Sequence, residues 1–309
     1  MGNDKIIITG ATGMIGTAVI REYLKHDTKA IYAVVRPGSK NISRIPKDER
    51  IRIIECEISD YSSLKDRICE KCDVFFHFAW DGTGANKGKS TKGQALNIVY
   101  TLDALNAAHE LCCGKFIGSG SQAEYGILDL ESINEESPAN PVIPYGIAKL
   151  AAGQLALAEA KKLGMDCFWV RIFSAYGLYD KPTTMISNAL ARFQAGEKMS
   201  FTPAEQRWDY LHCDDAARAF YAIAEKSEGQ KLYCLGSGQP RRLKEFIYAM
   251  RDIIDPDAEP GIGEIPYKGN EVMNLCADIT RIRTDTGWEP KISFEEGIKM
   301  ILSHLTPGV

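Results

Sequence analysis

The stretch Lys5-Ile-Ile-Ile-Thr-Gly-Ala-Thr-Gly-Met-Ile-Gly16 decides the fold of this 309-residue chain. Its β-branched run at residues 6–8 predicts a strand that is buried on both faces. Apolar residues then recur at helical spacing from Ala18 to Leu24. Between the strand and the helix lie three glycines, Gly10, Gly13 and Gly16. A strand, a glycine-rich turn and a helix together predict a site for a dinucleotide diphosphate, because glycine lets backbone N–H groups approach the phosphates.

Composition places the chain among soluble globular proteins with one large domain or two closely joined ones. A net charge of −4 gives no support for binding nucleic acid. No apolar run approaches the ~20 residues of a membrane span, and we recognise no signal peptide, so we expect a cytoplasmic protein without a membrane partner. Nine cysteines then predict reduced thiols. Cys69 and Cys72 have redox or zinc spacing, but no second pair follows at a matching distance, so we predict no metal.

Strand and helix patterns alternate over about 170 residues, which predicts an α/β fold with a Rossmann-type, doubly wound parallel sheet. Beyond Ser174 the rhythm changes to helical patterns separated by long loops that contain prolines. We therefore expect a dinucleotide-binding Rossmann domain at 1–174 and a smaller substrate-binding lobe at 175–309, with some segments returning to the sheet. After the first strand, the predicted strands of the sheet lie at 30–35, 51–55, 73–79, 115–119 and 165–172.

The end of the predicted second strand indicates which dinucleotide is bound. In this fold a carboxylate about 20 residues past the glycine turn normally holds the ribose 2′-OH of NAD. Arg36 occupies the corresponding position here. Because a guanidinium attracts a 2′-phosphate, we predict NADP as the cofactor, with NAD as the alternative. A solvated surface arginine is the other interpretation of Arg36.

Tyr145 and Lys149 are four residues apart in a predicted helix, so they share one helix face. An ammonium close to a phenol typically lowers the pKa of the phenol by about 1–3 pH units. The sequence therefore predicts Tyr145 as a general acid or base that works near neutral pH. We interpret His77, inside the predicted fourth strand, as a core residue in preference to a catalyst.

These residues belong to a series of motifs through which the chain resembles the extended short-chain dehydrogenases/reductases. That family comprises nucleotide-sugar epimerases, dehydratases and ketoreductases. The motifs span nearly the whole chain in the expected order, and they are Thr9-Gly-Ala-Thr-Gly-Met-Ile-Gly16, Phe76-His-Phe-Ala79, Ser119-Gly-Ser-Gln-Ala-Glu-Tyr-Gly126, Tyr145-Gly-Ile-Ala-Lys149, Arg171-Ile-Phe-Ser-Ala-Tyr-Gly177, Trp208-Asp-Tyr-Leu-His-Cys-Asp-Asp215, Tyr233-Cys-Leu-Gly-Ser-Gly238 and Gly287-Trp-Glu-Pro290.

The resemblance assigns roles by position. It implies that Tyr145 donates or accepts the proton, that Lys149 is its partner, and that Ser121 hydrogen-bonds the substrate oxygen. Asn97 would support the backbone of the active site. The residues implied to bind the cofactor are Gly10, Thr12, Gly13, Met14, Ile15, Gly16, Arg36, Glu57, Ile58, Ala79, Tyr145 and Lys149. Those implied to bind the substrate are Ser121, Gln122, Ser174, Arg207 and Trp208.

Three departures from the family pattern concern the activity and the binding of substrate. The sugar dehydratases carry Asp and Glu just after the catalytic hydroxyl, whereas this chain has Gln122 and Ala123, which cannot ionise. The arginine that usually contacts the phosphates of the sugar nucleotide is displaced by one position, to Arg207, and Ser174 replaces a common asparagine.

The resemblance therefore favours NADPH-dependent reduction of a nucleotide-activated 4-keto-6-deoxy sugar in deoxysugar biosynthesis. The first alternative is a nucleotide-sugar 4-epimerase with tightly bound NAD. The second is a catalytically idle, NADP-sensing protein of the same fold. The family often forms homodimers through its two long helices, here about 95–111 and 145–163, and we expect a homodimer.

Overall fold

The computed structural model describes residues 4–83, 90–269 and 271–305. Its centre is a seven-stranded sheet in the order β10-β6-β5-β4-β1-β2-β3, with every neighbouring pair parallel. The order changes direction between β1 and β4, and open α/β sheets bind their ligands at such a point. The strands are β1 (Lys5–Thr9), β2 (Ala30–Val35), β3 (Ile51–Glu55), β4 (Val74–His77), β5 (Lys115–Ser121), β6 (Asp166–Ile172) and β10 (Gln230–Leu235).

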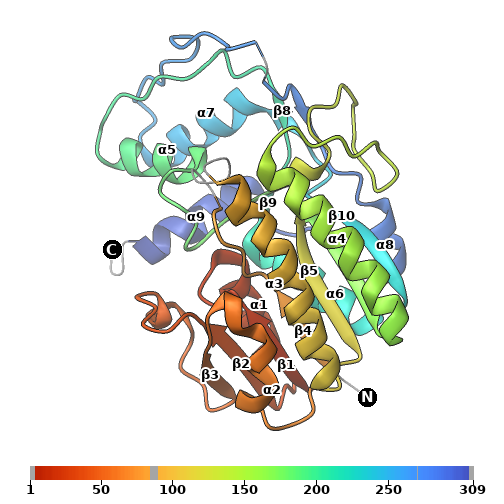
Figure 1. Ribbon diagram of the computed structural model, residues 1–309. Helices are drawn as coiled ribbons and strands as arrows, with labels where there is room; N and C mark the ends of the chain where they lie inside the picture. The colour runs from red at the N-terminus through yellow and green to blue at the C-terminus, as the bar shows by residue number, and fades with distance from the viewer. Residues whose placement is uncertain (1–3, 84–89, 270, 306–309) are drawn as a thin grey trace.

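Helices cover both faces of this sheet, which confirms the predicted doubly wound α/β fold (Figure 1). One face packs against α2 (Leu64–Arg67), α3 (Thr91–Glu110) and α4 (Pro144–Leu163). The other face packs against α1 (Met14–Tyr23), α6 (Cys213–Lys226) and α8 (Thr280–Thr286).

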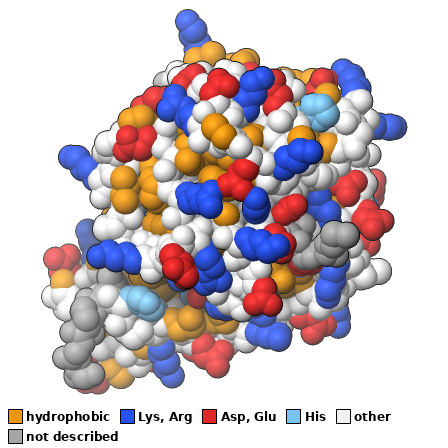
Figure 2. All heavy atoms as spheres, turned by 90° about the horizontal axis from the view of Figure 1, so that it is seen from below, with side chains coloured by type: hydrophobic (Ala, Val, Ile, Leu, Met, Phe, Trp, Pro, Cys, Tyr) orange, Lys and Arg blue, Asp and Glu red, His pale blue; other side chains and the backbone are white. Residues whose placement is uncertain are grey.

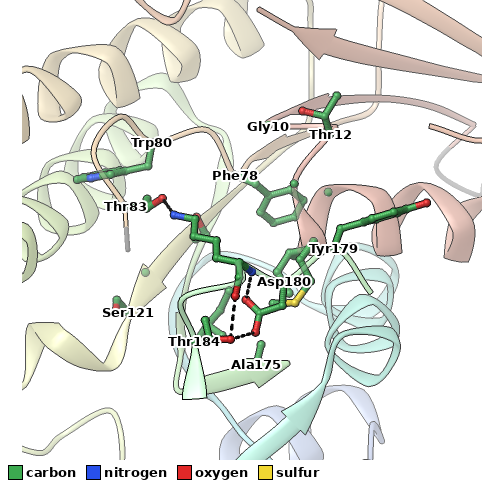
Figure 3. Close-up of a pocket in the computed structure, with 18 of the residues that line it drawn as sticks. Gly10, Thr12, Phe78, Trp80, Thr83, Ser121, Ala175, Tyr179, Asp180 and Thr184 are labelled. Carbon is green, nitrogen blue, oxygen red and sulfur yellow. Dashed lines mark hydrogen bonds between the residues drawn. The ribbon is translucent and has the colours of Figure 1, made fainter. Parts of the chain in front are cut away.

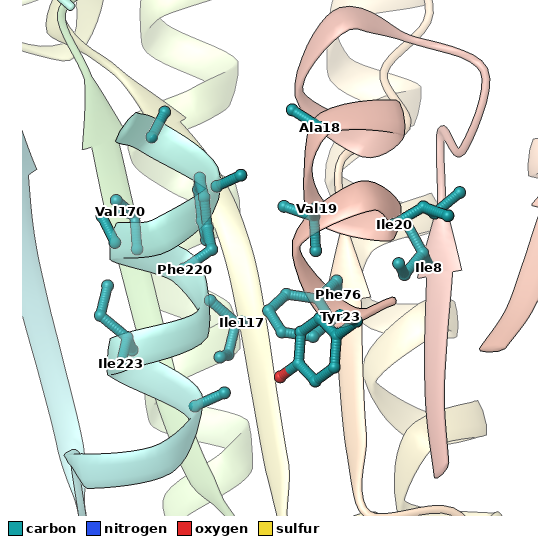
Figure 4. Close-up of a cluster of buried hydrophobic side chains, with 14 of the residues drawn as sticks. Ile8, Ala18, Val19, Ile20, Tyr23, Phe76, Ile117, Val170, Phe220 and Ile223 are labelled. Carbon is teal, nitrogen blue, oxygen red and sulfur yellow. The ribbon is translucent and has the colours of Figure 1, made fainter. Parts of the chain in front are cut away.

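The core on the second face is built from aromatic and β-branched side chains (Figure 4). Tyr23 of α1 meets the ring of Phe76 of β4 edge to face, with the ring centroids 5.6 Å apart. The ring of Phe220 of α6 also meets Phe76 edge to face, with the ring centroids 6.5 Å apart. These contacts fix α1, and therefore the glycine turn before it, against the sheet.

A separate hydrophobic core is formed by α5 (Met185–Gln194), α7 (Leu243–Ile254) and α9 (Phe294–Leu305). Phe246 and Phe294 meet edge to face in that core at 4.7 Å. Two small sheets lie in the same part of the chain: β7 (Ser174–Tyr176) pairs with β9 (Tyr210–His212), and β8 (Arg207–Trp208) lies between β11 (Arg241–Arg242) and β12 (Asn274–Leu275). Interspersed with these elements along the chain, α6, β10 and α8 belong to the seven-stranded sheet and the helices that cover it.

The predicted strands are present, but an α-helix does not follow every strand as the alternating pattern predicts. Between β2 and β3 the described chain forms only a 3₁₀ turn, η1 (Ile42–Arg44). Between β3 and β4 the chain forms mostly the 3₁₀ segment η2 (Ile58–Ser63), followed by the short α2. The seventh strand, β10, was not predicted, because its partner β6 lies far away in the sequence and its six residues follow an ordinary loop.

Charged side chains are interspersed on the surface shown in Figure 2, with Lys and Arg lying among Asp and Glu. None of the described helices combines the length and the apolarity needed to span a membrane. All nine cysteines lie within the described residues, and none of them forms a disulfide. Cys69 is exposed and Cys72 is buried.

Candidate active site

Two cavities open next to each other at the carboxyl ends of β1, β4 and β5. The first has a volume of about 580 Å³ and the second about 630 Å³. Figure 3 shows the first, with Gly10 and Thr12 on one side and Asp180 and Thr184 on the other. The residues common to both cavities are Gly10, Thr12, Gly13, Phe78, Trp80, Thr83 and Lys181. A long ligand could therefore pass from one cavity to the other across the glycine turn.

The glycine turn is shaped so that no side chain could replace two of its glycines. Gly10 has a φ of +68°, and a Cβ there would lie 2.8 Å from the backbone nitrogen of Ala79. A Cβ on Gly16 would lie 2.3 Å from the carbonyl oxygen of Gly10, so α1 packs directly on the end of β1. Gly13 precedes α1 and has no side chain to cap it, so the N–H groups at the start of the helix can donate hydrogen bonds to an anion. The turn fits the diphosphate of a dinucleotide.

The second cavity brings together the residues predicted to hold the adenosine half of the cofactor. Arg36, from the end of β2, lines it opposite Glu57 and Ile58, which follow β3. Ala79, after β4, also lines it. Arg36 is exposed, so its guanidinium is accessible to a ligand phosphate.

The first cavity brings together the predicted catalytic residues Ser121, Tyr145 and Lys149. Ser121 ends β5, whereas the other two lie on the first turns of α4. The Ser121 hydroxyl hydrogen-bonds the Tyr145 phenol. The Lys149 ammonium donates to the Ser119 carbonyl at 2.6 Å and lies 3.7 Å from the centre of a Trp80 ring.

The expected lowering of the pKa of Tyr145 is wrong for this structure. Burial raises the pKa of Tyr145 to about 12, although the hydrogen bond from Ser121 acts in the opposite direction. Tyr145 is only 7% exposed. Loss of hydration raises the free energy of the phenolate by more than the hydrogen bond from Ser121 lowers it. The Lys149 ammonium contacts the Ser119 carbonyl and the Trp80 ring. Tyr145 is therefore held in its protonated form.

Asn97 supports the backbone near the site, whereas the ring of His77 is buried between side-chain hydroxyls. Asn97 of α3 accepts a hydrogen bond from the Asp81 nitrogen at 2.8 Å and donates to the Asp81 carbonyl at 3.0 Å. It thereby holds the loop that follows β4. His77 lies between the hydroxyls of Thr9 and Thr101, at 3.0 and 3.3 Å, and burial lowers its pKa to about 3. The interpretation of His77 as a core residue is confirmed.

The comparison with known proteins can now be made. A family model described as "NAD dependent epimerase/dehydratase family" matches residues 6–236. The chain belongs to this family. It is similar to a dTDP-glucose 4,6-dehydratase of Streptomyces niveus, with 24% identity over 95% of this chain and 90% of that protein.

The same fold appears in solved structures of similar size. A UDP-glucose 4-epimerase of Thermotoga maritima with UDP-glucose has a TM-score of 0.87 and 24% identity, covering 97% of this chain and 98% of that one. A structure of RMD from Pseudomonas aeruginosa complexed with NADPH has a TM-score of 0.80 and 23% identity, with the same coverage. Because the family is NAD-dependent and the glycine turn fits a dinucleotide, the cofactor of this family member is a nicotinamide dinucleotide.

The loop after β7 contributes residues that the sequence analysis missed. Tyr179, Asp180 and Lys181 line the first cavity. The Asp180 carboxylate accepts a hydrogen bond from the Thr184 hydroxyl at 2.8 Å, and burial raises its pKa (Figure 3). Lys181 donates to the Thr83 hydroxyl, and burial lowers its pKa. The feature of the sequence that could have identified these residues is the position of the loop, which comes directly after a strand at the ligand-binding edge.

Four residues predicted to bind substrate lie outside the two cavities. In the described part of the chain, neither cavity is lined by Gln122, Ser174, Arg207 or Trp208. The Trp208 indole donates instead to the Ser174 hydroxyl at 2.8 Å, which joins β8 to β7. Arg207 is exposed on β8. Contacts between these residues and a substrate stay predictions.

One cluster of possible metal ligands lies within the described residues, and it already has other partners. His212, Cys213 and Asp214 bring their ligand atoms within 4.8 Å of one another. However, His212 accepts the N–H of Asp214 as the cap of α6, and Asp214 pairs with Arg21 at 2.6 Å. We infer no metal site from this cluster.

Proposed function

We propose that this family member reduces a 4-keto-6-deoxy sugar, carried on a nucleoside diphosphate, with NADPH. The main observation that supports the proposal is that two adjoining cavities contain the catalytic residues and the cofactor-selecting residue, respectively. One contains Ser121, Tyr145 and Lys149, and the adjoining one presents Arg36 where an NAD-binding protein would have a carboxylate. A nucleotide sugar as substrate is supported by similar proteins, which are named as dTDP-glucose dehydratase and UDP-glucose epimerase.

Reduction of a ketone needs one hydride and one proton, and the protein supplies the proton. When bound, the nicotinamide dinucleotide supplies the hydride. Tyr145, kept protonated by burial, donates its proton to the ketone oxygen, and the Ser121 hydroxyl donates a hydrogen bond to the same oxygen. Lys149 lines the same cavity, and its positive charge favours the phenolate that remains after the proton is transferred.

Two related activities fit this chain less well. Dehydration needs an acid and a base beside the catalytic hydroxyl, and Gln122 and Ala123 supply neither. Epimerisation would use the same Tyr145 and Lys149. However, an epimerase re-reduces the sugar with the cofactor it has just used, so it benefits from tightly held NAD, and Arg36 argues against NAD.

We also propose that the protein is a homodimer through α3 and α4. These two helices lie side by side on one face of the sheet (Figure 1). Their outer surfaces expose large apolar side chains, namely Leu96 and Val99 on α3 and Ile147 and Leu155 on α4. An exposed apolar surface of this kind is typical of a protein interface.

Replacing Arg36 by alanine is expected to weaken NADPH binding selectively. A charge-assisted contact with the 2′-phosphate contributes about 1.5–3 kcal/mol, so the Kd for NADPH should rise by about 10- to 150-fold while that for NADH stays unchanged. Titration calorimetry with both cofactors measures this. The matched control is Arg283→Ala, which removes an exposed arginine that lines neither cavity. Equal affinity of the wild type for the two cofactors would exclude Arg36 as the selecting residue.

The cofactor content of the purified protein separates the reductase from the epimerase. The protein is purified without added nucleotide and denatured, and the released nucleotides are identified by chromatography. A reductase that exchanges its cofactor should release far less than one NAD per chain. One equivalent of NAD per chain would support the epimerase and contradict this proposal.

A further inference from the structure

A buried ion pair lies directly behind the Ser121 and Tyr145 hydroxyls. Glu124, the last residue of the 3₁₀ turn η4 (Gln122–Glu124), is fully buried, and Arg171 of β6 is 5% exposed. The Arg171 Nε donates to the Glu124 Oε2 at 2.7 Å. Neither residue lines the cavities, and the proposed mechanism uses neither.

The other oxygen of Glu124 holds the backbone of the catalytic serine. Glu124 Oε1 accepts the Ser121 N–H at 2.8 Å and the Trp169 indole N–H at 3.0 Å. The Ser121 hydroxyl in turn accepts the N–H of Ala123 at 3.2 Å. The turn therefore closes on itself through reciprocal hydrogen bonds, and the position of the Ser121 oxygen depends on where the Glu124 carboxylate lies.

The surroundings leave this carboxylate little freedom to move. A Cβ on Gly120 would lie 2.6 Å from Glu124 Oε1, and a Cβ on Gly153 of α4 would lie 2.5 Å from the Trp169 indole nitrogen. The Arg171 guanidinium also stacks 4.4 Å from the centre of the Tyr125 ring. Because apolar residues of similar volume often stabilise a core as well as a buried ion pair does, stability alone gives little reason for this pair.

We propose that Glu124 and Arg171 are positioning residues, which hold the Ser121 turn against Tyr145 and balance the charge behind the two hydroxyls. This inference rests on the proposed function, since it takes Ser121 and Tyr145 as the groups that act on the ketone oxygen. Glu124 and Arg171 themselves touch neither the substrate nor the cofactor.

The charges of the pair act on Tyr145 in opposite directions. The Glu124 carboxylate raises the pKa of Tyr145, because a negative charge disfavours the phenolate. By the same Coulombic argument, the Arg171 guanidinium favours it. Among the described residues, the other charged or titratable groups that line the first cavity are Arg44 on η1, Lys149 on α4, and Tyr179, Asp180 and Lys181 in the loop after β7. All of them stay in place when the ion pair is changed.

The test is the pH profile of the reverse reaction, in which NADP⁺ oxidises the 4-hydroxy sugar and Tyr145 must first lose its proton. Because burial raises the pKa of Tyr145 to about 12, kcat/KM of the wild type should rise with pH throughout the range in which the protein stays folded. In Glu124→Gln this rising limb should move to lower pH, and in Arg171→Met it should move to higher pH. The double variant Glu124→Gln/Arg171→Met should return close to the wild-type profile. In every variant the Kd for NADPH should stay within about twofold of the wild-type value.

Arg21→Met and Asp214→Asn are the matched controls, because they break a partly buried ion pair between α1 and α6, outside both cavities. Their rising limbs should not move. Displacement of the rising limb in the same direction in Glu124→Gln and Arg171→Met would overturn the inference. Loss of packing in the core would explain such a result, whereas the opposite charges of the two residues would not. Unchanged limbs in both would overturn it too.

A second measurement keeps this inference separate from the proposed function. Amide hydrogen exchange of residues 118–125 should be at least about tenfold faster in Glu124→Ala than in the wild type, with exchange in α7 unchanged. If the wild type turns over no keto sugar, the proposed function fails, and the exchange result still decides whether Glu124 holds the turn. Equal exchange in the two proteins would show that it does not.

Discussion

Replacing Tyr145 by phenylalanine should lower kcat by about 10²–10⁴-fold and leave the Kd for the cofactor nearly unchanged. The substitution removes one oxygen, which hydrogen-bonds Ser121 and carries the transferable proton. The ring stays, so its packing beside the Trp80 indole is preserved. Steady-state kinetics with a 4-keto sugar nucleotide, together with cofactor titration, measure both quantities.

The control for this substitution is Tyr248→Phe, which removes the same oxygen from an exposed tyrosine on α7. It should leave kcat unchanged. A Tyr145→Phe enzyme with near-normal kcat would mean that another group protonates the ketone. In that case Asp180, whose pKa is raised by burial in the same cavity, is the next residue to test.

Replacing Lys149 by methionine should lower both turnover and cofactor affinity. The lysine is 3% exposed, and its ammonium contacts the Ser119 carbonyl and the Trp80 ring in the first cavity. Methionine fills a similar volume without the charge. Loss of a charge-assisted hydrogen bond costs about 1.5–3 kcal/mol, so we expect the Kd for NADPH to rise by about 10- to 150-fold and kcat to fall as well.

Lys162→Met is the matched control, because it makes the same change on the same helix at an exposed lysine that pairs with Glu159. It should alter neither quantity. If Lys149→Met lowers kcat while the Kd for NADPH keeps its wild-type value, Lys149 serves the phenol alone and does not contact the cofactor.

The sequence predicted the sheet well because its signals are local. Several predicted strands, such as those at 6–8 and 30–35, are short runs of apolar residues, and the glycine turn at Gly10–Gly16 lies between a strand pattern and a helix pattern. The strand β10 was missed because it is defined by pairing with β6, about 60 residues earlier in the chain. Pairing between distant segments leaves little trace in a single sequence.

The residues of the candidate site were likewise predicted where they lie in local motifs and missed where they do not. Residues that lie in motifs, such as Ser121 and Tyr145, were predicted, and the fold brings them together. Lys181 and Asp180 were missed because the loop after β7 carries no motif, and its position after a strand does not by itself show that Lys181 lines both cavities beside the glycine turn. The pKa of Tyr145 was predicted in the wrong direction because the spacing of Tyr145 and Lys149 shows their proximity but not their burial.

The most direct test of the proposed function is whether the enzyme consumes external NADPH. The protein is incubated with a 4-keto-6-deoxyhexose nucleotide and NADPH, and the absorbance of the reduced nicotinamide is followed while the sugar is quantified. We predict the loss of one equivalent of NADPH for each sugar reduced to its 4-hydroxy form. Interconversion of two 4-hydroxy sugars with no net consumption of cofactor would contradict the proposal and establish an epimerase.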